Sequence, residues 1–325
     1  MKGILIVKKK ILVSLPIEQR HKDFLAKQVE GYDVEMKFVD ADNITLDDVK
    51  DVNVILGSIK RKWIKAAENL EWLQIIYAGA DMFTVPGLLK PETILTNASG
   101  AYNTEVAEHM LALTFSLVRH FDYYMKNQIK HTWQQLNSVK SVKGSTILIL
   151  GLGRIGNDYA KKVKSLGAYV IGIKRTVKDK PDYVDELYTI DKLDEVIGRA
   201  DIIAMVLPGS EDTKHIINTE RLKKIKHGAF LINVGRGNAI DFEALKTFLK
   251  TDQIGGVGLD VTDPEPLPVD DELWDFDNVI ITPHIAGHLF LDESNEIIVE
   301  IIADNLKRWL NGEPLKNVVN RQLGY

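Results

Sequence analysis

Cysteine is missing from all 325 residues of the chain. Its absence excludes disulfide bonds, thiolate metal sites, iron–sulfur clusters and cysteine nucleophiles, and it fits a reducing compartment such as the cytoplasm. A long hydrophobic run is missing too, because the most apolar stretch, residues 106–118, is interrupted by polar side chains and is shorter than the roughly 20 residues that a bilayer requires. The apolar run at 11–15 is too short for a signal-peptide core. We therefore expect a cytoplasmic protein without a membrane partner.

An excess of positive charge is also missing. The chain has 41 Lys and Arg residues against 46 Asp and Glu residues, which gives a net charge of −5 and a pI near 5.9. Because binding to a phosphate backbone requires a basic excess, nucleic acid is not expected as a partner. The eight histidines fall into no ligand-spaced pair, so no metal site is predicted.

Short apolar runs alternate with amphipathic segments along the chain, which is typical of α/β domains. The first series predicts strands at 4–7, 11–15, 52–56 and 73–77, with helices at 17–28 and 61–69. The second series predicts strands at 147–150, 169–173, 202–207, 229–234, 256–260 and 279–282. Segment 105–121 is apolar on almost every face and therefore needs other protein to cover it, and a last helix is predicted at 295–310.

These elements predict two doubly wound parallel-sheet domains. A Rossmann cofactor domain, residues 98–288, is inserted into a discontinuous flavodoxin-like substrate domain, residues 1–97, to which the C-terminal segment 289–325 returns.

The sequence GLGRIG at residues 151–156 follows a predicted strand and opens a helical pattern. Gly151 permits a tight turn, Gly153 lets a pyrophosphate approach the backbone, and Gly156 lets helix and strand pack closely. The free N–H groups at the helix start favour an anion, so Arg154 and Ile155 are predicted among the cofactor contacts. The alternative is a glycine-rich turn with another ligand or none.

The residues after the next strand indicate which dinucleotide binds. An NAD enzyme usually places an acid there, but no acid lies between Tyr159 and Lys178. Lys174, Arg175 and Thr176 stand in its place, and these side chains can bind a 2′-phosphate through charge-assisted hydrogen bonds. NADP(H) is therefore the preferred cofactor and NAD(H) the second option. The alternative is a solvated basic loop that binds nothing.

Three polar residues follow later strands, where a doubly wound sheet has its ligand crevice: Arg236, Glu265 and His284. Arg236 can bind a carboxylate bidentately and orient the adjacent carbonyl. His284 can donate a proton to the carbonyl oxygen as hydride arrives, and an ionised Glu265 would favour its imidazolium form. This combination predicts a 2-oxo acid reductase.

Five stretches in order resemble the D-isomer-specific 2-hydroxyacid dehydrogenases: GLGRIG at 151, LPGSEDTKHIIN at 207, GAFLINVGRG at 228, GGVGLDVTDPEPLP at 255 and NVIITPHIAG at 278. The resemblance implies an active site in a cleft between two α/β domains, a homodimer joined through the cofactor domain, and catalysis by Arg236, Glu265 and His284. The resemblance also implies an NADP(H)-dependent reduction that yields a D-2-hydroxy acid.

The resemblance extends to binding residues. It implies that Gly79 and Ala80 offer backbone N–H groups to the substrate carboxylate and that Asp260 holds the nicotinamide carboxamide. The other cofactor contacts that it implies are Leu207, Pro208, Thr213, Val234, Gly235, Arg236, His284 and Gly287. Lys174 to Thr176 make the chain similar to the NADPH-using glyoxylate and hydroxypyruvate reductases, and Glu265, which is not Gln, argues against the formate dehydrogenase branch.

Some residues and functions stay open. His109 is interpreted as structural, and His288 as a surface residue with substrate contact as the alternative. The candidates for side-chain selectivity are Ile59, Tyr77, Tyr102 and Leu289, and the alternative for the two tyrosines is a packing role. One alternative function is a dinucleotide-sensing binding protein similar to the corepressors that resemble this family. Another is an NADP-linked oxidoreductase that acts on a different acid, such as phosphite or a sugar acid.

Overall fold

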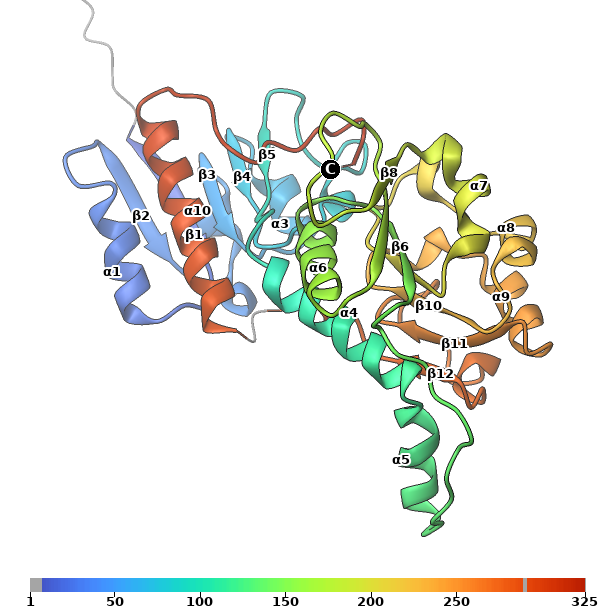
Figure 1. Ribbon diagram of the computed structural model, residues 1–325. Helices are drawn as coiled ribbons and strands as arrows, with labels where there is room; N and C mark the ends of the chain where they lie inside the picture. Colours follow the sequence, from blue (N-terminus) through green and yellow to red (C-terminus); the bar gives the residue numbers. More distant parts are fainter. Residues whose placement is uncertain (1–7, 289–290, 325) are drawn as a thin grey trace, which may run out of the picture. The chain divides into compact units, whose positions relative to one another are not determined.

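The computed structural model describes residues 8–288 and 291–324. They form two compact units (Figure 1). Unit 1 takes its described residues from Met1–Ala101 and Leu289–Tyr325, and unit 2 is Tyr102–His288. The first predicted limit, after Asn97, lies four residues before the limit of unit 1. The ranges 1–97, 98–288 and 289–325 remain our proposal for the functional domains.

Within the described residues, unit 1 contains one parallel sheet of five strands in the order β2-β1-β3-β4-β5. This is the flavodoxin-like order, with its switch point between β1 and β3. The strands are β1 (Lys9–Ser14), β2 (Val34–Phe38), β3 (Val54–Gly57), β4 (Trp72–Gln74) and β5 (Ile94–Thr96). The helices are α1 (Gln19–Lys27), α2 (Leu46–Val49), α3 (Arg61–Ala66) and α10 (Asp292–Leu310).

The C-terminal helix α10 belongs to unit 1 and packs beside α1 (Figure 1). The Asn305 amide donates to Oε1 of Gln74 on β4 at 3.0 Å. The ring of Trp309 lies 6.3 Å from that of the fully buried Trp72. Buried apolar and amide contacts together therefore hold the returning segment on the sheet.

Unit 2 contains, within its described residues, a parallel sheet of seven strands in the order β12-β11-β10-β9-β6-β7-β8. This is the Rossmann order with one strand added. The strands are β6 (Thr146–Leu150), β7 (Tyr169–Ile173), β8 (Glu186–Tyr188), β9 (Ile202–Met205), β10 (Ala229–Asn233), β11 (Ile254–Leu259) and β12 (Val279–Ile281). The helices are α4 (Asn103–Val118), α5 (Phe121–Ile129), α6 (Arg154–Ser165), α7 (Leu193–Val196), α8 (Thr219–Lys224) and α9 (Phe242–Leu249).

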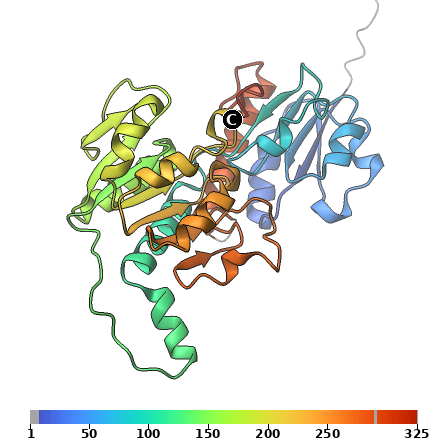
Figure 2. The same ribbon diagram turned by 90° about the vertical axis from the view of Figure 1, so that its right-hand side faces the viewer.

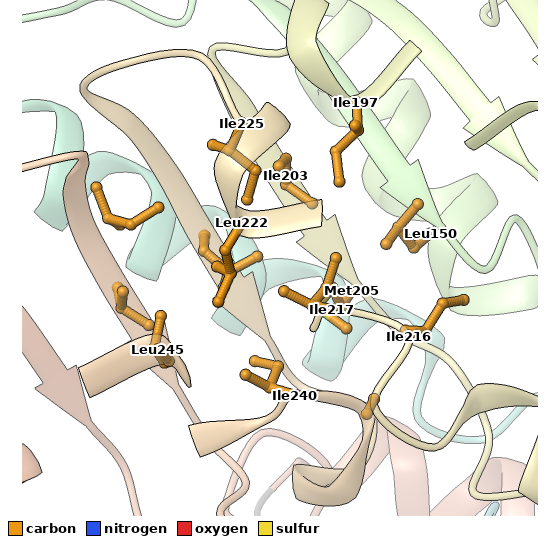
Figure 3. Close-up of a cluster of buried hydrophobic side chains, with 14 of the residues drawn as sticks. Leu150, Ile197, Ile203, Met205, Ile216, Ile217, Leu222, Ile225, Ile240 and Leu245 are labelled. Atoms are coloured by element: carbon orange, nitrogen blue, oxygen red, sulfur yellow. The ribbon is translucent and has the colours of Figure 1, made fainter. Parts of the chain in front are cut away.

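Short 3₁₀ helices fill several connections: η1 (Ala41–Asn43), η2 (Asp81–Phe83), η3 (Ile190–Lys192), η4 (Ile197–Arg199), η5 (Glu211–Thr213), η6 (Gly237–Ala239) and η7 (Glu272–Trp274). One face of the unit 2 sheet carries a large aliphatic core (Figure 3), to which Leu150, Met205, Leu222 and Leu245 contribute. This core fixes the strands at whose ends the site residues lie.

Most of the apolar segment predicted at 105–121 forms α4, which ends at Val118 and packs on β10, β11 and α6. A Cβ on Gly256 would lie 3.0 Å from Leu117, and a Cβ on Gly258 would lie 3.3 Å from Leu113. The glycines of β11 therefore let the helix lie directly on the strand. Between α4 and α6, the hydroxyl groups of Thr114 and Tyr159 are 2.7 Å apart. Burial raises the pKa of the Tyr159 phenol.

The predicted fold class is confirmed, although three strands, β2, β5 and β8, were not predicted. β2 is an edge strand of half-buried and exposed residues, and β5 and β8 are three residues long, so none of them shows a long apolar run. The strand predicted at 4–7 lies outside the described residues. Among residues 8–288 and 291–324, the structure contains no helix with the length and hydropathy to cross a bilayer.

Candidate active site

The glycine turn at residues 151–156 joins β6 to α6. Gly151 has a φ of +101°, and a Cβ there would lie 2.7 Å from the carbonyl oxygen of Val206. A Cβ on Gly156 would lie 2.2 Å from the carbonyl oxygen of Gly151, so glycine is needed for the helix to approach the turn. By contrast, a Cβ on Gly153 would meet no atom within 4 Å. The space over Gly153 is therefore open, and this residue caps α6 without a side chain, so the first helical N–H groups suit an anion.

The predicted cofactor contacts Arg154 and Ile155 are the first two residues of α6, directly after Gly153. Arg154 is exposed and Ile155 is half-buried. The Asn157 side chain donates to the Gly153 carbonyl at 2.6 Å and accepts from the Tyr183 hydroxyl at 3.0 Å. These bonds hold the turn in place from the side of the helix.

The basic loop predicted to select the cofactor follows β7, the strand next to β6 in the sheet. Lys174, Arg175 and Thr176 are all exposed. The backbone N–H of Lys174 donates to the Tyr188 carbonyl at 2.9 Å, which holds the start of the loop against β8. Because parallel strands end at the same edge, the basic loop and the glycine turn lie at one edge of the sheet.

His284 and Glu265 form a hydrogen-bonded pair. Nδ1 of His284 lies 2.8 Å from Oε2 of Glu265, and the side chains are 48% and 38% exposed. Since an ionised carboxylate only accepts, Nδ1 is the donor and Nε2 is the nitrogen left to exchange a proton with a substrate. The second carboxylate oxygen of Glu265 accepts the Thr262 backbone N–H at 3.0 Å, which fixes the carboxylate.

Arg236 lies in the connection between β10 and η6 and is half-buried. Its Nη1 donates to the Gly235 carbonyl at 2.8 Å. The aliphatic part of its side chain covers Gly209, where an added Cβ would lie 3.2 Å from Cγ of Arg236. The guanidinium is thus held by its own loop and by the loop after β9.

The glycines that flank Arg236 stand at close approaches between loop backbones. In the structure a Cβ on Gly235 would lie 2.6 Å from the Leu207 carbonyl oxygen, and a Cβ on Gly237 would lie 1.9 Å from the Thr262 carbonyl oxygen. Both glycines therefore allow the backbone of this loop to contact the backbones of its two neighbouring loops.

These contacts bring together the loops that carry the three predicted catalytic residues. The loop of Arg236 meets the loop of Glu265 at the contact between Gly237 and Thr262, and Glu265 binds His284. The loops follow β10, β11 and β12, which are neighbours in the sheet.

Asp260, directly after β11, is the buried centre of a second network. Its Oδ1 accepts the Thr282 hydroxyl at 2.6 Å and the Ile285 N–H at 2.9 Å, and its Oδ2 accepts the Ala286 N–H at 2.9 Å. His109 Nε2 lies 2.9 Å from Oγ1 of Thr282 and 3.6 Å from Oδ1 of Asp260. The carboxylate that we expected at the nicotinamide carboxamide thus also holds the loop that contains His284.

The predicted cofactor contacts Leu207, Pro208 and Thr213 follow β9. The Thr213 hydroxyl donates to the Pro208 carbonyl at 2.8 Å and accepts the Ser210 N–H at 3.0 Å, so it stabilises this turn. Leu207 is close to the glycine turn, since a Cβ on Gly151 would lie 3.3 Å from its Cδ2.

Two further predicted cofactor contacts are closely packed. Val234 is buried at the end of β10. A Cβ on Gly287 would lie 2.9 Å from Cγ2 of Val106, so packing against α4 is by itself a reason for glycine at this position.

The loop predicted to bind the substrate carboxylate contains Gly79 and Ala80, and it lies in unit 1 between β4 and η2. Ala80 is fully buried, and its carbonyl oxygen accepts the Phe83 N–H at 2.8 Å. The Asn97 amide donates to the Ala78 carbonyl at 2.7 Å. Bonds on both sides therefore hold the loop in one conformation.

The four selectivity candidates differ in exposure. Ile59 and Tyr102 are 6% and 5% exposed, whereas Tyr77 is 45% exposed. The Tyr77 ring stacks on Phe83, and its hydroxyl lies 3.3 Å from that of Ser58. Leu289 lies outside the described residues. His288, interpreted as a surface residue, is exposed.

Sequence reasoning missed Thr262 and Thr282. Both are single threonines after strands, and such residues have no distinctive spacing. Their roles depend on partners brought close by the sheet.

Comparison with known proteins identifies the family. The sequence profile described as D-isomer specific 2-hydroxyacid dehydrogenase, NAD binding domain, matches residues 111–286, more than half of the chain. The chain belongs to this family. The predicted resemblance is therefore confirmed, and the family makes the protein an oxidoreductase with an NAD-binding domain.

Similar proteins have different substrates in their names. The chain is 32% identical over 294 residues to the glyoxylate reductase of Thermofilum pendens, covering 86% of this chain and 84% of that protein. It is 31% identical over 315 residues to the D-3-phosphoglycerate dehydrogenase of Synechocystis, covering 96% of this chain but 56% of that protein. A solved structure, the NADPH-dependent glyoxylate/hydroxypyruvate reductase of Sinorhizobium meliloti in complex with NADP and sulfate, superposes with a TM-score of 0.82 at 26% identity, covering 98% and 100% of the two chains.

Proposed function

We propose that the protein reduces a small 2-oxo acid to the D-2-hydroxy acid with NADP(H), within the glyoxylate and hydroxypyruvate reductase branch of the family. The observation that carries the proposal is the exposed His284–Glu265 pair at 2.8 Å, on loops beside the loop of Arg236. An acid–base group and a carboxylate-binding cation are the two elements that reduction of a 2-oxo acid requires.

The residues at the glycine turn fit a dinucleotide. The open space over Gly153 and the uncapped start of α6 suit a pyrophosphate, and Lys174, Arg175 and Thr176 suit a 2′-phosphate. When bound, the cofactor supplies the hydride. The preference for NADP(H) is supported by the NADP in the related Sinorhizobium meliloti structure, and NAD(H) is the second option.

The protein's own groups position the substrate and move a proton. The guanidinium of Arg236 binds the carboxylate through two hydrogen bonds. For unit 1, Gly79 and Ala80 remain the proposed donors of backbone N–H groups to a carboxylate. His284 donates a proton from Nε2 to the carbonyl oxygen in reduction and accepts it back in oxidation. Glu265 accepts the Nδ1 hydrogen bond throughout, so the ring keeps its orientation.

The test is a kinetic screen of glyoxylate, hydroxypyruvate and longer 2-oxo acids with NADPH and NADH. Oxidation of NADPH is the expected result, with a D-configured product by chiral chromatography from hydroxypyruvate and the longer acids, because the glycolate formed from glyoxylate is achiral. NADPH binding without oxidation by any acid would contradict the proposal and support a dinucleotide-sensing protein.

We also propose that the protein is a homodimer joined through unit 2. In Figures 1 and 2, α5 and the segment after it extend away from the unit 2 sheet. This extension exposes Phe121, Met125, Ile129 and Trp133, the last two by 80% and 96%. Because exposed apolar patches mark interaction sites, we propose that unit 2 of a second copy packs against these side chains.

Light scattering should show a dimer. The double variant Ile129→Ser with Trp133→Ser should be a monomer, and a monomeric wild type would contradict this part of the proposal.

A further inference from the structure

The hydrogen bonds around Thr282 define how His109 acts. A threonine hydroxyl has one proton, and Thr282 donates it to Oδ1 of Asp260 at 2.6 Å. Nε2 of His109, 2.9 Å from the same hydroxyl oxygen, must therefore donate its own proton to Thr282. The donors run from His109 through Thr282 to a carboxylate whose side chain is 1% exposed.

Helix α4 presents His109 from a face that is packed against β11. His109, Leu113 and Leu117 are four residues apart and share one side of the helix. Leu113 and Leu117 lie against Gly258 and Gly256, where an added Cβ would be 3.3 and 3.0 Å away. His109, one turn before Leu113, therefore reaches the carboxylate that follows β11 from a fixed support.

The loop that receives these bonds, residues 282–287, carries the proposed acid. Asp260 binds it through both main chain and side chain: its carbonyl accepts the His284 N–H at 2.8 Å, and its carboxylate accepts those of Ile285 and Ala286 at 2.9 Å. His284 has a φ of +53°, which a residue with a Cβ adopts where its surroundings hold it. The direction of the His284 ring thus depends on Asp260.

We propose that His109 is a positioning residue for His284. By donating to Thr282 it orders the hydroxyl and the Asp260 carboxylate, and Asp260 holds the loop in the conformation that aims the imidazole. This assignment rests on the proposed function for its catalytic consequence, and it goes beyond our interpretation of His109 as a structural residue of α4.

Four single variants and one double variant separate positioning from simple packing. His109→Phe removes the donor but keeps an aromatic ring, and His109→Gln keeps an N–H donor. Thr282→Val removes the hydroxyl at nearly the same shape and tests the same link if His109→Phe fails to fold. His227→Phe is the matched control, because His227 is exposed and precedes the start of β10, at the opposite edge of the sheet.

The readouts are NADPH oxidation with glyoxylate and hydrogen exchange of the amides at 284–286. We expect His109→Phe and Thr282→Val each to lower kcat about tenfold, the effect of one ordinary hydrogen bond, with KM for glyoxylate within about twofold. The double variant should be no slower than either single variant, because both changes break one chain of bonds. His109→Gln should recover most of kcat, and amide exchange should be faster in His109→Phe than in His109→Gln, with the control unchanged.

Several results would overturn the assignment: unchanged kcat and exchange in both single variants, additive losses in the double variant, or equal losses in His109→Gln and His109→Phe. A wild-type protein that fails to oxidise NADPH with any of the 2-oxo acids would refute the proposed function instead. Amide exchange would then still decide whether His109 holds the loop.

Discussion

The polar groups after β11 and β12 fall into two sets that differ in exposure. His284 and Glu265 are 48% and 38% exposed, and they bond mainly to each other and to one backbone N–H. The side chain of Asp260 is 1% exposed, and its carboxylate accepts three hydrogen bonds from the loop that contains His284. The sets are joined by the His284 N–H, which donates to the Asp260 carbonyl.

This difference follows from what each set has to do. A group that exchanges a proton with substrate must be reachable, so its polar atoms can be partly hydrated before substrate arrives. A buried carboxylate must have its hydrogen bonds satisfied by protein, because a buried unpaired polar group is costly. Changes in the exposed set should therefore alter catalysis or binding with little effect on stability, whereas changes at Asp260 should lower stability in addition to any effect on turnover through the loop that Asp260 holds.

The largest effect is expected at the exposed acid. His284→Gln should lower kcat for 2-oxo acid reduction about 10³-fold, within the range that a positioned acid–base group contributes. NADPH affinity and the melting temperature should change little, because the side chain is half-exposed. Steady-state kinetics, NADPH fluorescence titration and thermal unfolding provide the three measurements. A normal kcat would remove His284 from the mechanism.

The next effect concerns substrate binding. Arg236→Ala should lower kcat/KM for the oxo acid about 10²- to 10³-fold, since it removes two charge-assisted hydrogen bonds to the carboxylate. NADPH affinity should change by less than about threefold. Equal losses for acid and cofactor would show that Arg236 serves the dinucleotide and not the substrate.

The buried set should respond in stability. Asp260→Ala leaves two backbone N–H groups and the Thr282 hydroxyl without their acceptor, so the free energy of unfolding should fall by about 3 kcal/mol. Glu265→Ala is the matched comparison and should cost below about 0.5 kcal/mol while slowing turnover. Urea unfolding of both variants is the measurement. Similar losses of stability would break the division between the two sets.

The smallest effect is expected at the exposed basic loop. Like the other exposed groups, it should affect binding and leave stability nearly unchanged. Arg175→Asp should shift the ratio of kcat/KM for NADPH over NADH about 10- to 100-fold toward NADH, because a carboxylate repels the 2′-phosphate. Stability should remain within about 0.5 kcal/mol. An unchanged ratio would argue against the basic loop as the phosphate site, and the control Lys192→Asp, on an exposed lysine of η3, should leave it unchanged.

Local sequence patterns were sufficient for several features. Apolar runs predicted β6, β7, β9, β10 and β11, and the glycine spacing predicted the turn between β6 and α6, because both signals lie within a few neighbouring residues. Short half-buried edge strands such as β8 have no such signal.

The roles of individual glycines show where local reasoning ends. The positive φ of Gly151 follows from the turn that it makes. The reason for Gly237 is the Thr262 backbone, which comes from another loop, and the reason for Gly258 is a leucine of α4. Neither contact can be inferred from spacing along the chain.

The sequence by itself determined the fold class, the cofactor turn and the three residue types needed for reduction of an oxo acid, because these depend on short-range patterns and on side-chain chemistry. The tertiary structure decided which polar groups are buried and which remain exposed. His109 and Thr282 are 173 positions apart, yet the sheet and α4 bring them within 2.9 Å. Packing of distant segments creates such contacts, so their physical role emerges once the chain is folded.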